Sequence, residues 1–240
     1  MPATSRPTQS SAQPAAAQVP AGSERPTASL PDLPPLNVQA ERLISLGVPE
    51  LAGIDAARVR KVVDGVTHPP SQAPLLVLPG APVGALAPLM TRAGKPGFVV
   101  QDMTDVDEFT PIEGLDIPQQ PYVLEGVDRG DELRNASPEE AMTALTEAGR
   151  TPLTLTEGIF WVLAQPEALA ANHCFMTIAS RRRKARGGLD ARTPALWISG
   201  GTGRDGAERR GAAKVGWCWA RNRHTWLGFA SALERTPIAK

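Results

Sequence analysis

LLVLPGAPVGALAPLMTRAGKPGFVVQ, residues 75–101, carries the clearest structural signal in the chain. Its apolar run at 75–78 is typical of a buried strand, residues 83–93 have the composition of a helix, and residues 97–101 predict a second strand. Two strands joined through one helix usually lie parallel in the same sheet. We therefore expect an α/β or α+β fold built on a mixed sheet.

Two helices are expected on the N-terminal side of this segment. Apolar residues recur at helical spacing between Asn37 and Gly47, and Asp55 is a suitable N-cap for a helix that continues to Val63. Residues 1–36 are instead rich in Ala, Pro, Ser, Thr and Gln, a composition that cannot bury enough apolar surface to offset chain entropy. We predict a disordered tail at 1–36 and a single globular domain at 37–234.

The C-terminal half is expected to contain helices and an antiparallel sheet. Ser137-Pro-Glu-Glu140 is typical of a helix start, and residues 156–163 predict another helix. Three strands are predicted, at 174–178, 195–199 and 214–220. The last of them is expected to turn back along residues 224–230 and form an antiparallel, Trp-rich hairpin.

Two charged, Gly-rich segments, at about 181–192 and 200–213, are interpreted as insertion loops on the surface. The second contains Gly-Thr-Gly-Arg-Asp-Gly at 201–206, which matches the G-x-G-x-x-G pattern of dinucleotide-binding turns. That pattern requires a helix directly afterwards, but the following segment is short and is interrupted by Gly211. We expect a flexible loop at this position.

The charges of the chain are unevenly distributed although they cancel. The 25 basic and 25 acidic residues argue against a general binder of nucleic acid or anionic membranes. Residues 102–147 nevertheless hold thirteen acidic and two basic residues, whereas residues 181–240 hold fourteen basic and four acidic ones. The two segments either face each other inside the domain or present opposite patches to partners.

The sequence predicts a reduced, cytoplasmic protein. It contains no apolar run of membrane-spanning length, and its N-terminus lacks the basic start and apolar core of a secretory signal. Two Cys cannot build a disulfide framework, although one bridge between positions 174 and 218 is geometrically possible. We expect no membrane association.

GWCWARNRHTW, residues 216–226, gathers three of the five Trp, one of the two Cys and one of the three His. Exposed indoles beside arginine would form a binding platform for peptide aromatics, sugars or bases. The candidate contact residues are Trp217, Trp219, Arg221, Arg223 and Trp226. The alternative is that these Trp side chains fill a core that has few other aromatic residues.

A chemical role for this segment would centre on Cys218 and His224. A thiolate beside an imidazole suits a cysteine nucleophile, and Asn222 is available to orient the ring. Because side chains alternate along a strand, Cys218 faces away from both Trp217 and Trp219. It faces solvent or a groove if the Trp pair is buried, and it is an inert core thiol if the pair is exposed.

The Cys and His residues also suggest a transition-metal site. Cys174, Cys218 and His224 are the candidate ligands, and His68 or His173 would supply a further nitrogen. The spacing is unfavourable, because the only close pair is adjacent and neighbouring residues on a strand point to opposite faces. The alternative is buried thiols and hydrogen-bonded imidazoles.

The chain resembles a family of actinobacterial proteins that share a domain of unknown function. The residues that carry the resemblance run from Leu43-Ile-Ser-Leu-Gly-Val-Pro49 to Asn222-Arg-His-Thr-Trp-Leu-Gly228. They include Thr154-Leu-Thr-Glu-Gly158, Asn172-His-Cys-Phe175, Pro194-Ala-Leu-Trp-Ile-Ser199 and Gly216-Trp-Cys-Trp219. The resemblance implies no activity, and the segment between Gly200 and Lys214 departs from the family pattern as an insertion.

These observations favour a non-enzymatic binding or interaction module whose partner is another protein. One alternative is a Cys/His-based enzyme or metal-binding protein centred on Cys218 and His224. Another is nucleic-acid binding through the basic residues at 181–223, which the zero net charge disfavours. The sequence specifies neither a cofactor nor an oligomeric state.

Overall fold

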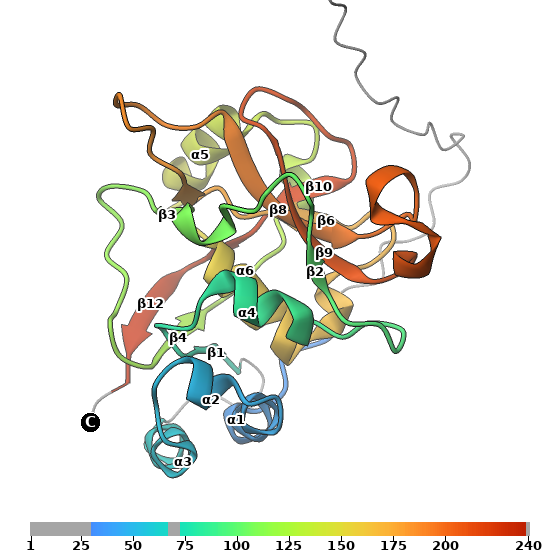
Figure 1. Cartoon of the computed structure of the whole chain (residues 1–240). Coiled ribbons are helices and arrows are strands. Elements are labelled where there is room, and N and C mark those ends of the chain that lie inside the picture. The colour runs from blue at the N-terminus through green and yellow to red at the C-terminus, as the bar shows by residue number, and fades with distance from the viewer. Residues whose placement is uncertain (1–29, 67–72, 239–240) are drawn as a thin grey trace, which may run out of the picture.

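A computed structural model describes residues 30–66 and 73–238 (Figure 1). It confirms a mixed α/β single domain with helices at its N-terminal end. Helices α1 (Leu36–Ser45), α2 (Val48–Leu51) and α3 (Ala56–Asp64) form one end of the molecule. Residues 1–29 of the predicted tail lie outside the described residues.

A three-stranded antiparallel sheet packs next to these helices. Its order is β1 (Leu75–Val77), β4 (Tyr122–Glu125) and β12 (Glu234–Pro237). The pairing places the end of the described chain beside segments that lie more than a hundred positions earlier in the sequence.

A mixed five-stranded sheet forms the other end of the molecule. Its order is β10 (Leu227–Phe229), β6 (Cys174–Met176), β8 (Arg192–Ile198), β9 (Ala213–Trp219) and β2 (Phe98–Val99). Strands β6, β8 and β9 are antiparallel to their neighbours in this central part, whereas β10 and β2 pair in parallel at the two edges.

Shorter elements complete the fold. Helix α4 (Val83–Leu86) follows β1, and α5 (Pro138–Glu147) begins at the predicted cap Ser137, which forms a capping box with Glu140. Two small sheets pair β11 (Ser231–Ala232) with β5 (Thr151–Pro152) and β3 (Thr110–Pro111) with β7 (Ser180–Arg181). Single 3-10 turns lie at Ala87–Leu89, Val106–Glu108, Asp131–Leu133, Pro166–Ala168, Gly203–Asp205 and Ala207–Arg209.

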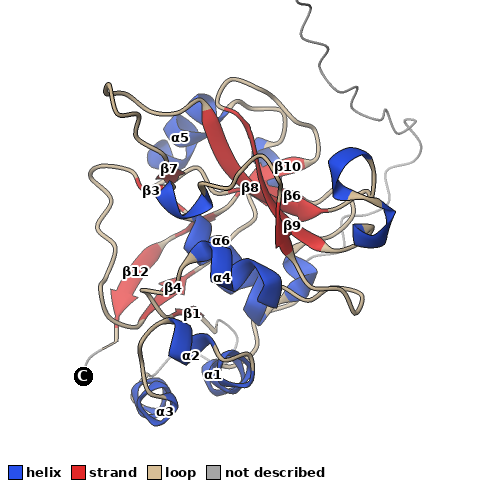
Figure 2. Ribbon diagram, viewed as in Figure 1, coloured by secondary structure: helices blue, strands red, loops and turns tan. Residues whose placement is uncertain are grey.

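Helix α6 (Leu155–Ala164) lies between the two larger sheets and forms the centre of the core (Figure 2). Its N-terminus is fixed by a capping box between Thr154 and Glu157, and nearly every residue of the helix is buried. Trp161 stacks on Phe175 of β6 with ring centroids 5.2 Å apart. At Gly158 a Cβ atom would lie 2.6 Å from the Thr177 side chain, so this position lets the helix approach the sheet closely.

A buried ion pair joins α6 to the C-terminal strand. Arg235 of β12 donates from Nε to Glu157 Oε1 at 2.7 Å and from Nη2 to Oε2 at 2.8 Å, and the Glu157 side chain is fully buried. The Tyr122 hydroxyl donates to the same carboxylate at 3.0 Å. Every oxygen of Glu157 therefore has partners, which is the condition under which a buried charge is tolerated.

The segment before α1 also contacts this centre. Gln165, which directly follows α6, donates its side-chain amide to the carbonyl of Pro31 at 2.6 Å. Leu30 and Leu33 pack against the core. Residues 30–35, which the composition assigns to the tail, are thus in contact with the domain.

The expected parallel pairing of residues 75–78 with 97–101 is wrong. Strand β1 pairs with β4 in the three-stranded sheet, whereas β2 pairs with β9 in the five-stranded sheet. The connecting residues carry the chain past α6 from one sheet to the other (Figure 2). Apolar periodicity identifies strands but does not encode which strand is the partner.

The expected antiparallel hairpin between residues 214–220 and 224–230 is also wrong. Strands β9 and β10 run in the same direction, and β8 and β6 separate them in the sheet. Residues 220–226 therefore cross back over the sheet instead of forming a tight turn. The tight two-residue hairpin turns need residues of positive φ, and none of the described residues 220–226 has a positive φ.

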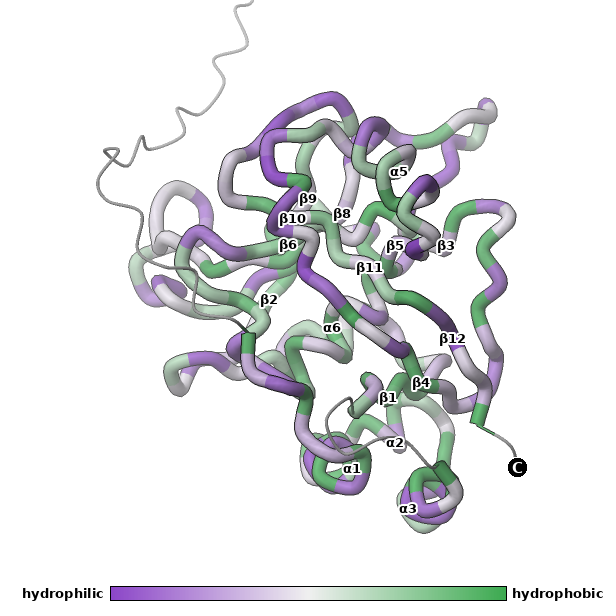
Figure 3. Tube along the Cα trace, turned by 180° about the vertical axis from the view of Figure 1, so that it is seen from behind, coloured by the Kyte–Doolittle hydropathy of each residue, from purple (hydrophilic) through white to green (hydrophobic). Residues whose placement is uncertain are grey.

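The acidic and basic segments face each other inside the domain. Arg192 pairs with Asp105 at 2.6 Å, and Arg182 pairs with Glu108 at 2.7 Å. Further pairs join Glu113 to Arg183 and Asp102 to Arg204. Viewed from behind, hydrophilic residues concentrate in the loops that surround the sheets (Figure 3). Much of the charge asymmetry is thus neutralised within the chain.

The segment at 200–213 is anchored to the sheet. Asp205 accepts from Lys214 Nζ at 2.5 Å and from the Ser199 hydroxyl at 2.7 Å, and the ion pair is nearly buried. The G-x-G-x-x-G segment is followed by a single 3-10 turn instead of the helix that a dinucleotide site requires. In the described part of the chain no helix has the length and apolar character needed to cross a membrane.

Candidate functional site

Strand β9 changes from buried to exposed along its length. Ala213 and Val215 are buried, Trp217 is half-buried, and the Trp219 side chain at the end of the strand is 46% exposed. The Trp217 and Trp219 rings meet edge to face with centroids 4.6 Å apart. Because both residues are odd-numbered on one strand, they share a face, as alternation predicts. One indole thus supports its exposed neighbour.

Arg192 lies below this Trp pair. It is the register partner of Trp219 on β8, and its guanidinium carbon lies 6.0 Å from the Trp217 ring and 5.2 Å from the Phe109 ring. Asp105 and Asp190 both accept from it. Hydrogen bonds from Arg192 lower the pKa of Asp190 to about 2. The guanidinium is therefore fixed between aromatic rings and carboxylates, and it holds the Trp217 ring in place.

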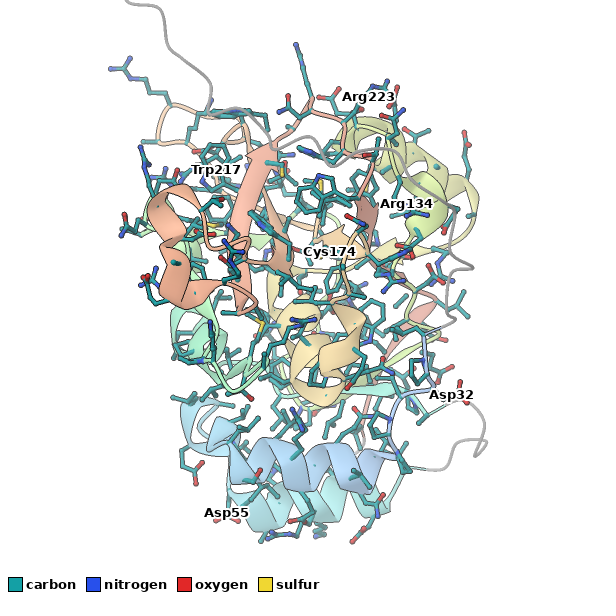
Figure 4. All side chains as sticks on the ribbon, turned by 90° about the vertical axis from the view of Figure 1, so that its right-hand side faces the viewer. Asp32, Asp55, Arg134, Cys174, Trp217 and Arg223 are labelled. Carbon is teal, nitrogen blue, oxygen red and sulfur yellow. The ribbon has the colours of Figure 1, made fainter. Side chains whose placement is uncertain are left out.

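The crossing segment 220–226 carries cations to the same end of the sheet. Its Arg221 and Arg223 side chains are exposed, and Figure 4 shows Trp217 and Arg223 at the end of the molecule opposite Asp55. Arg223 is paired with Glu140 and also donates to the Asn135 carbonyl at 2.8 Å. Arg221 takes part in no ion pair with another described residue. Of these two arginines, Arg221 is thus the one without a charged partner among the described residues.

Trp226 belongs to a separate aromatic row on the opposite face of the sheet. Its ring lies 6.1 Å from Trp197 and 5.6 Å from the His224 imidazole. Lys214 Nζ lies 4.8 Å from the Trp197 ring, and a Cβ atom at Gly216 would collide with that ring at 2.3 Å. The five predicted contact residues are therefore split between two faces, and Trp226 does not share a surface with Trp217 and Trp219.

The structure does not assemble Cys218 and His224 as a nucleophile and its base. Burial raises the pKa of the Cys218 thiol to about 12, so the thiolate is scarce at neutral pH. Burial also lowers the pKa of His224, and its Nε2 atom is buried without a hydrogen-bond partner in the described residues. No hydrogen bond joins the two side chains in this part of the chain. Cys218 is half-buried, and of the Trp pair Trp219 is exposed and Trp217 half-buried, so the strand has no fully exposed and no fully buried face at this end.

The candidate metal ligands do not converge either. Within residues 30–66 and 73–238 no group of three or more His, Cys, Asp or Glu side chains is placed to share an ion. Asp131 Oδ2 accepts from His173 Nδ1 at 2.9 Å, and burial raises the pKa of Cys174 to about 11. Both Cys are free thiols, so the 174–218 bridge is not formed. His68 lies outside the described residues.

Two residues near the exposed Trp were missed from the sequence. Arg192 was overlooked because its role depends on the pairing of β8 with β9, which only the fold specifies. Leu189 is 41% exposed and lies two positions before Ala191, whose carbonyl accepts from the Ala220 N–H at 2.8 Å. No signal in the sequence could have singled out Leu189, because single exposed apolar residues are common on protein surfaces.

Comparison with known proteins identifies the family of the chain. Residues 42–238 match the model named "Family of unknown function (DUF5701)", and because the match covers most of the chain, the protein belongs to that family. No curated protein and no solved structure matches the chain.

Proposed function

We propose that this member of the family is a non-enzymatic protein-binding module. Its contact surface, called here the Trp219 surface, consists of Leu189, Trp217, Trp219 and Arg221. The observation that carries the proposal is the 46% exposure of Trp219 on a strand face that begins with the buried residues Ala213 and Val215. An indole left in water on a rigid support is typical of a binding anchor, since Trp and Arg dominate the binding energy of protein interfaces.

The rigidity of the support favours this interpretation. Trp219 is held by the Trp217 ring, and Trp217 is in turn held by Arg192 and its two carboxylates. A side chain that is already ordered loses little conformational entropy when a partner covers it. The same residue on a mobile loop would be a weaker candidate.

The partner is proposed to carry acidic residues around an apolar anchor. Lys184, Arg186 and Arg221 are exposed at this end of the sheet, and none forms an ion pair with a described residue. The neighbouring Arg182, Arg183 and Arg192 are already neutralised by acidic side chains. The remaining positive charge would steer an acidic protein segment toward the exposed Trp.

We also propose that the protein is cytoplasmic and that its family is actinobacterial. Two free thiols, Cys174 buried and Cys218 half-buried, support a reducing environment, because they need no oxidant to complete the fold. The alternatives of a Cys218-based enzyme and of nucleic-acid binding have less support. A Cys218-based enzyme needs a thiolate, but burial raises the pKa of this thiol. Nucleic-acid binding needs free arginines, but Arg182 and Arg192 are already paired with acidic side chains.

The test compares three forms of the purified protein as immobilised bait for extracts of the cells that produce it. They are the wild type, the double variant Trp219→Ser/Arg221→Glu, and the matched control Val38→Ser, which removes an exposed apolar side chain from α1. We expect a defined set of proteins to be retained by the wild type and the control but lost from the double variant. Retention that is the same on all three forms would overturn the proposal, and so would the absence of any retained protein.

A further inference from the structure

A second site lies at the end of the molecule opposite the Trp219 surface. A pocket of about 470 Å³ opens where the turn between α2 and α3, the end of β1, the loop before β4 and the end of β12 converge. Asp55, the N-cap of α3, marks this end in Figure 4. The volume falls in the range of small-molecule sites, roughly 300–1,000 Å³.

About half of the pocket's surface is apolar. It includes Ile54, Leu78, Pro79, Pro121 and Pro237, and proline supplies four of the eleven lining residues. The apolar part of the wall favours the hydrocarbon part of a ligand, because the contact removes apolar surface of both the ligand and the protein from water.

The pocket has few hydrogen-bond donors. Proline has no N–H group, and the N–H groups of Ala52, Gly53 and Ile54 already donate to carbonyls of α2. The Gln119 amide donates to the Ile117 carbonyl at 2.9 Å. The donors that remain among the lining side chains are the Arg58 guanidinium and the Gln120 amide.

Arg58 supplies the only positive charge of the lining. It lies in the first turn of α3 and forms no ion pair with any described residue, whereas Arg60 on the same helix is paired with Glu41 at 2.6 Å. The nearest acidic residue in sequence, Asp55, uses Oδ1 to accept from the Ala57 N–H at 2.7 Å. A guanidinium beside an apolar wall is suited to a carboxylate that carries a hydrocarbon body.

We propose that this pocket binds a small aliphatic carboxylic acid. The carboxylate pairs with Arg58 and accepts from Gln120, and the hydrocarbon part packs on the proline, Ile54 and Leu78 side chains. The site does not depend on the Trp219 surface, because no residue is shared between them.

Sodium octanoate is the probe for this site, with octan-1-ol as the uncharged analogue. We expect ligand-observed NMR to show saturable octanoate binding with a Kd below about 10 mM, and about tenfold weaker binding of octanol, because the alcohol lacks the charge that pairs with arginine. Amide resonances of Ile54 and Gln120 should shift on titration. Absence of saturable octanoate binding would overturn the proposal.

Two variants assign the binding to Arg58. Arg58→Gln should weaken octanoate about tenfold and remove the preference over octanol, whereas the matched control Arg60→Gln should bind as the wild type does. Equal binding by both variants would contradict the assignment. Tighter binding of N-acetyl-leucyl-leucine than of octanoate would also contradict it and would identify a peptide C-terminus as the ligand. Trp219→Ser should bind octanoate normally, so failure of the protein-binding proposal would leave this one standing.

Discussion

The surroundings of Glu157 and the end of β9 are both rich in aromatic and charged side chains, but they differ in what they leave unpaired. Around Glu157 the arginine, the tyrosine and the helix cap satisfy the carboxylate within a fully buried site. At the end of β9 an indole is exposed and Arg221 has no charged partner among the described residues. The difference indicates that the first region stabilises the fold and the second is available to a partner.

The largest effect is expected at the buried ion pair. Glu157→Gln leaves the Arg235 guanidinium buried without a counter-charge, and such a loss typically lowers the free energy of unfolding by about 3–5 kcal/mol. Urea denaturation measures this change.

The matched control for that variant is Glu41→Gln, which breaks the exposed pair with Arg60. Its urea midpoint should equal that of the wild type, because solvent screens exposed pairs. If Glu157→Gln unfolded at the same urea concentration as Glu41→Gln, this result would contradict the stabilising role of the buried ion pair.

A smaller effect is expected where α6 meets the sheet. Gly158→Ala adds a methyl group 2.6 Å from the Thr177 side chain, and overpacking of this kind usually costs about 1–3 kcal/mol. Gly65→Ala is the control, because its Cβ would find its nearest neighbour at 3.6 Å and its backbone φ is negative. Equal stability of the two variants, measured by thermal unfolding, would show that the approach of α6 to the sheet is not tight.

The exposed Trp should matter less for stability than a buried one. Trp219→Ser removes one edge-to-face contact from a side chain that is already 46% exposed, so we expect the free energy of unfolding to fall by only about 1–2 kcal/mol. Trp161→Ala, in the buried region, should cost about 3–5 kcal/mol. The comparison would fail if the two substitutions were equally destabilising in urea titrations, since Trp219 would then be part of the core.

The smallest effect is a pH dependence that arises from His224. Burial lowers the pKa of this imidazole in the folded state below its ordinary value of 6.5. The unfolded chain therefore binds the proton first, and stability falls as the pH drops below 6.5 until the folded-state pKa is reached. His224→Gln should remove this dependence.

Urea midpoints at pH 7.5 and about pH 5.5 measure the effect, because carboxylates with lowered pKa values such as Asp190 titrate well below this window. A wild-type midpoint that rises toward pH 5.5 would have the wrong sign for a buried, neutral imidazole.

The sequence was sufficient for the local features of the fold. Asp55 caps α3, Ser137 begins α5, and the alternation along β9 places Trp217 and Trp219 on one face. These features depend on residues close together in the chain, so their signals are local.

The features that the sequence did not reveal depend on long-range pairing. Residue alternation gives β9 two faces, but it does not specify that β8 and β6 separate it from β10. For the same reason Cys218 and His224 are close in sequence without forming a pair, and Arg192 reaches Trp217 from a strand that the sequence does not link to it. Strand partners are selected by the packing of the whole core, which no short motif encodes.

The exposure of the Trp219 indole inside the producing cells is the most direct test of the Trp219 surface. Hydroxyl-radical labelling followed by mass spectrometry would compare Trp219 in the purified protein with Trp219 in intact cells, with Leu233, which is 57% exposed elsewhere, as the internal reference. We predict several-fold lower labelling of Trp219 in cells and unchanged labelling of Leu233, because a bound partner excludes water from the indole. Equal labelling of Trp219 in both samples would contradict the account.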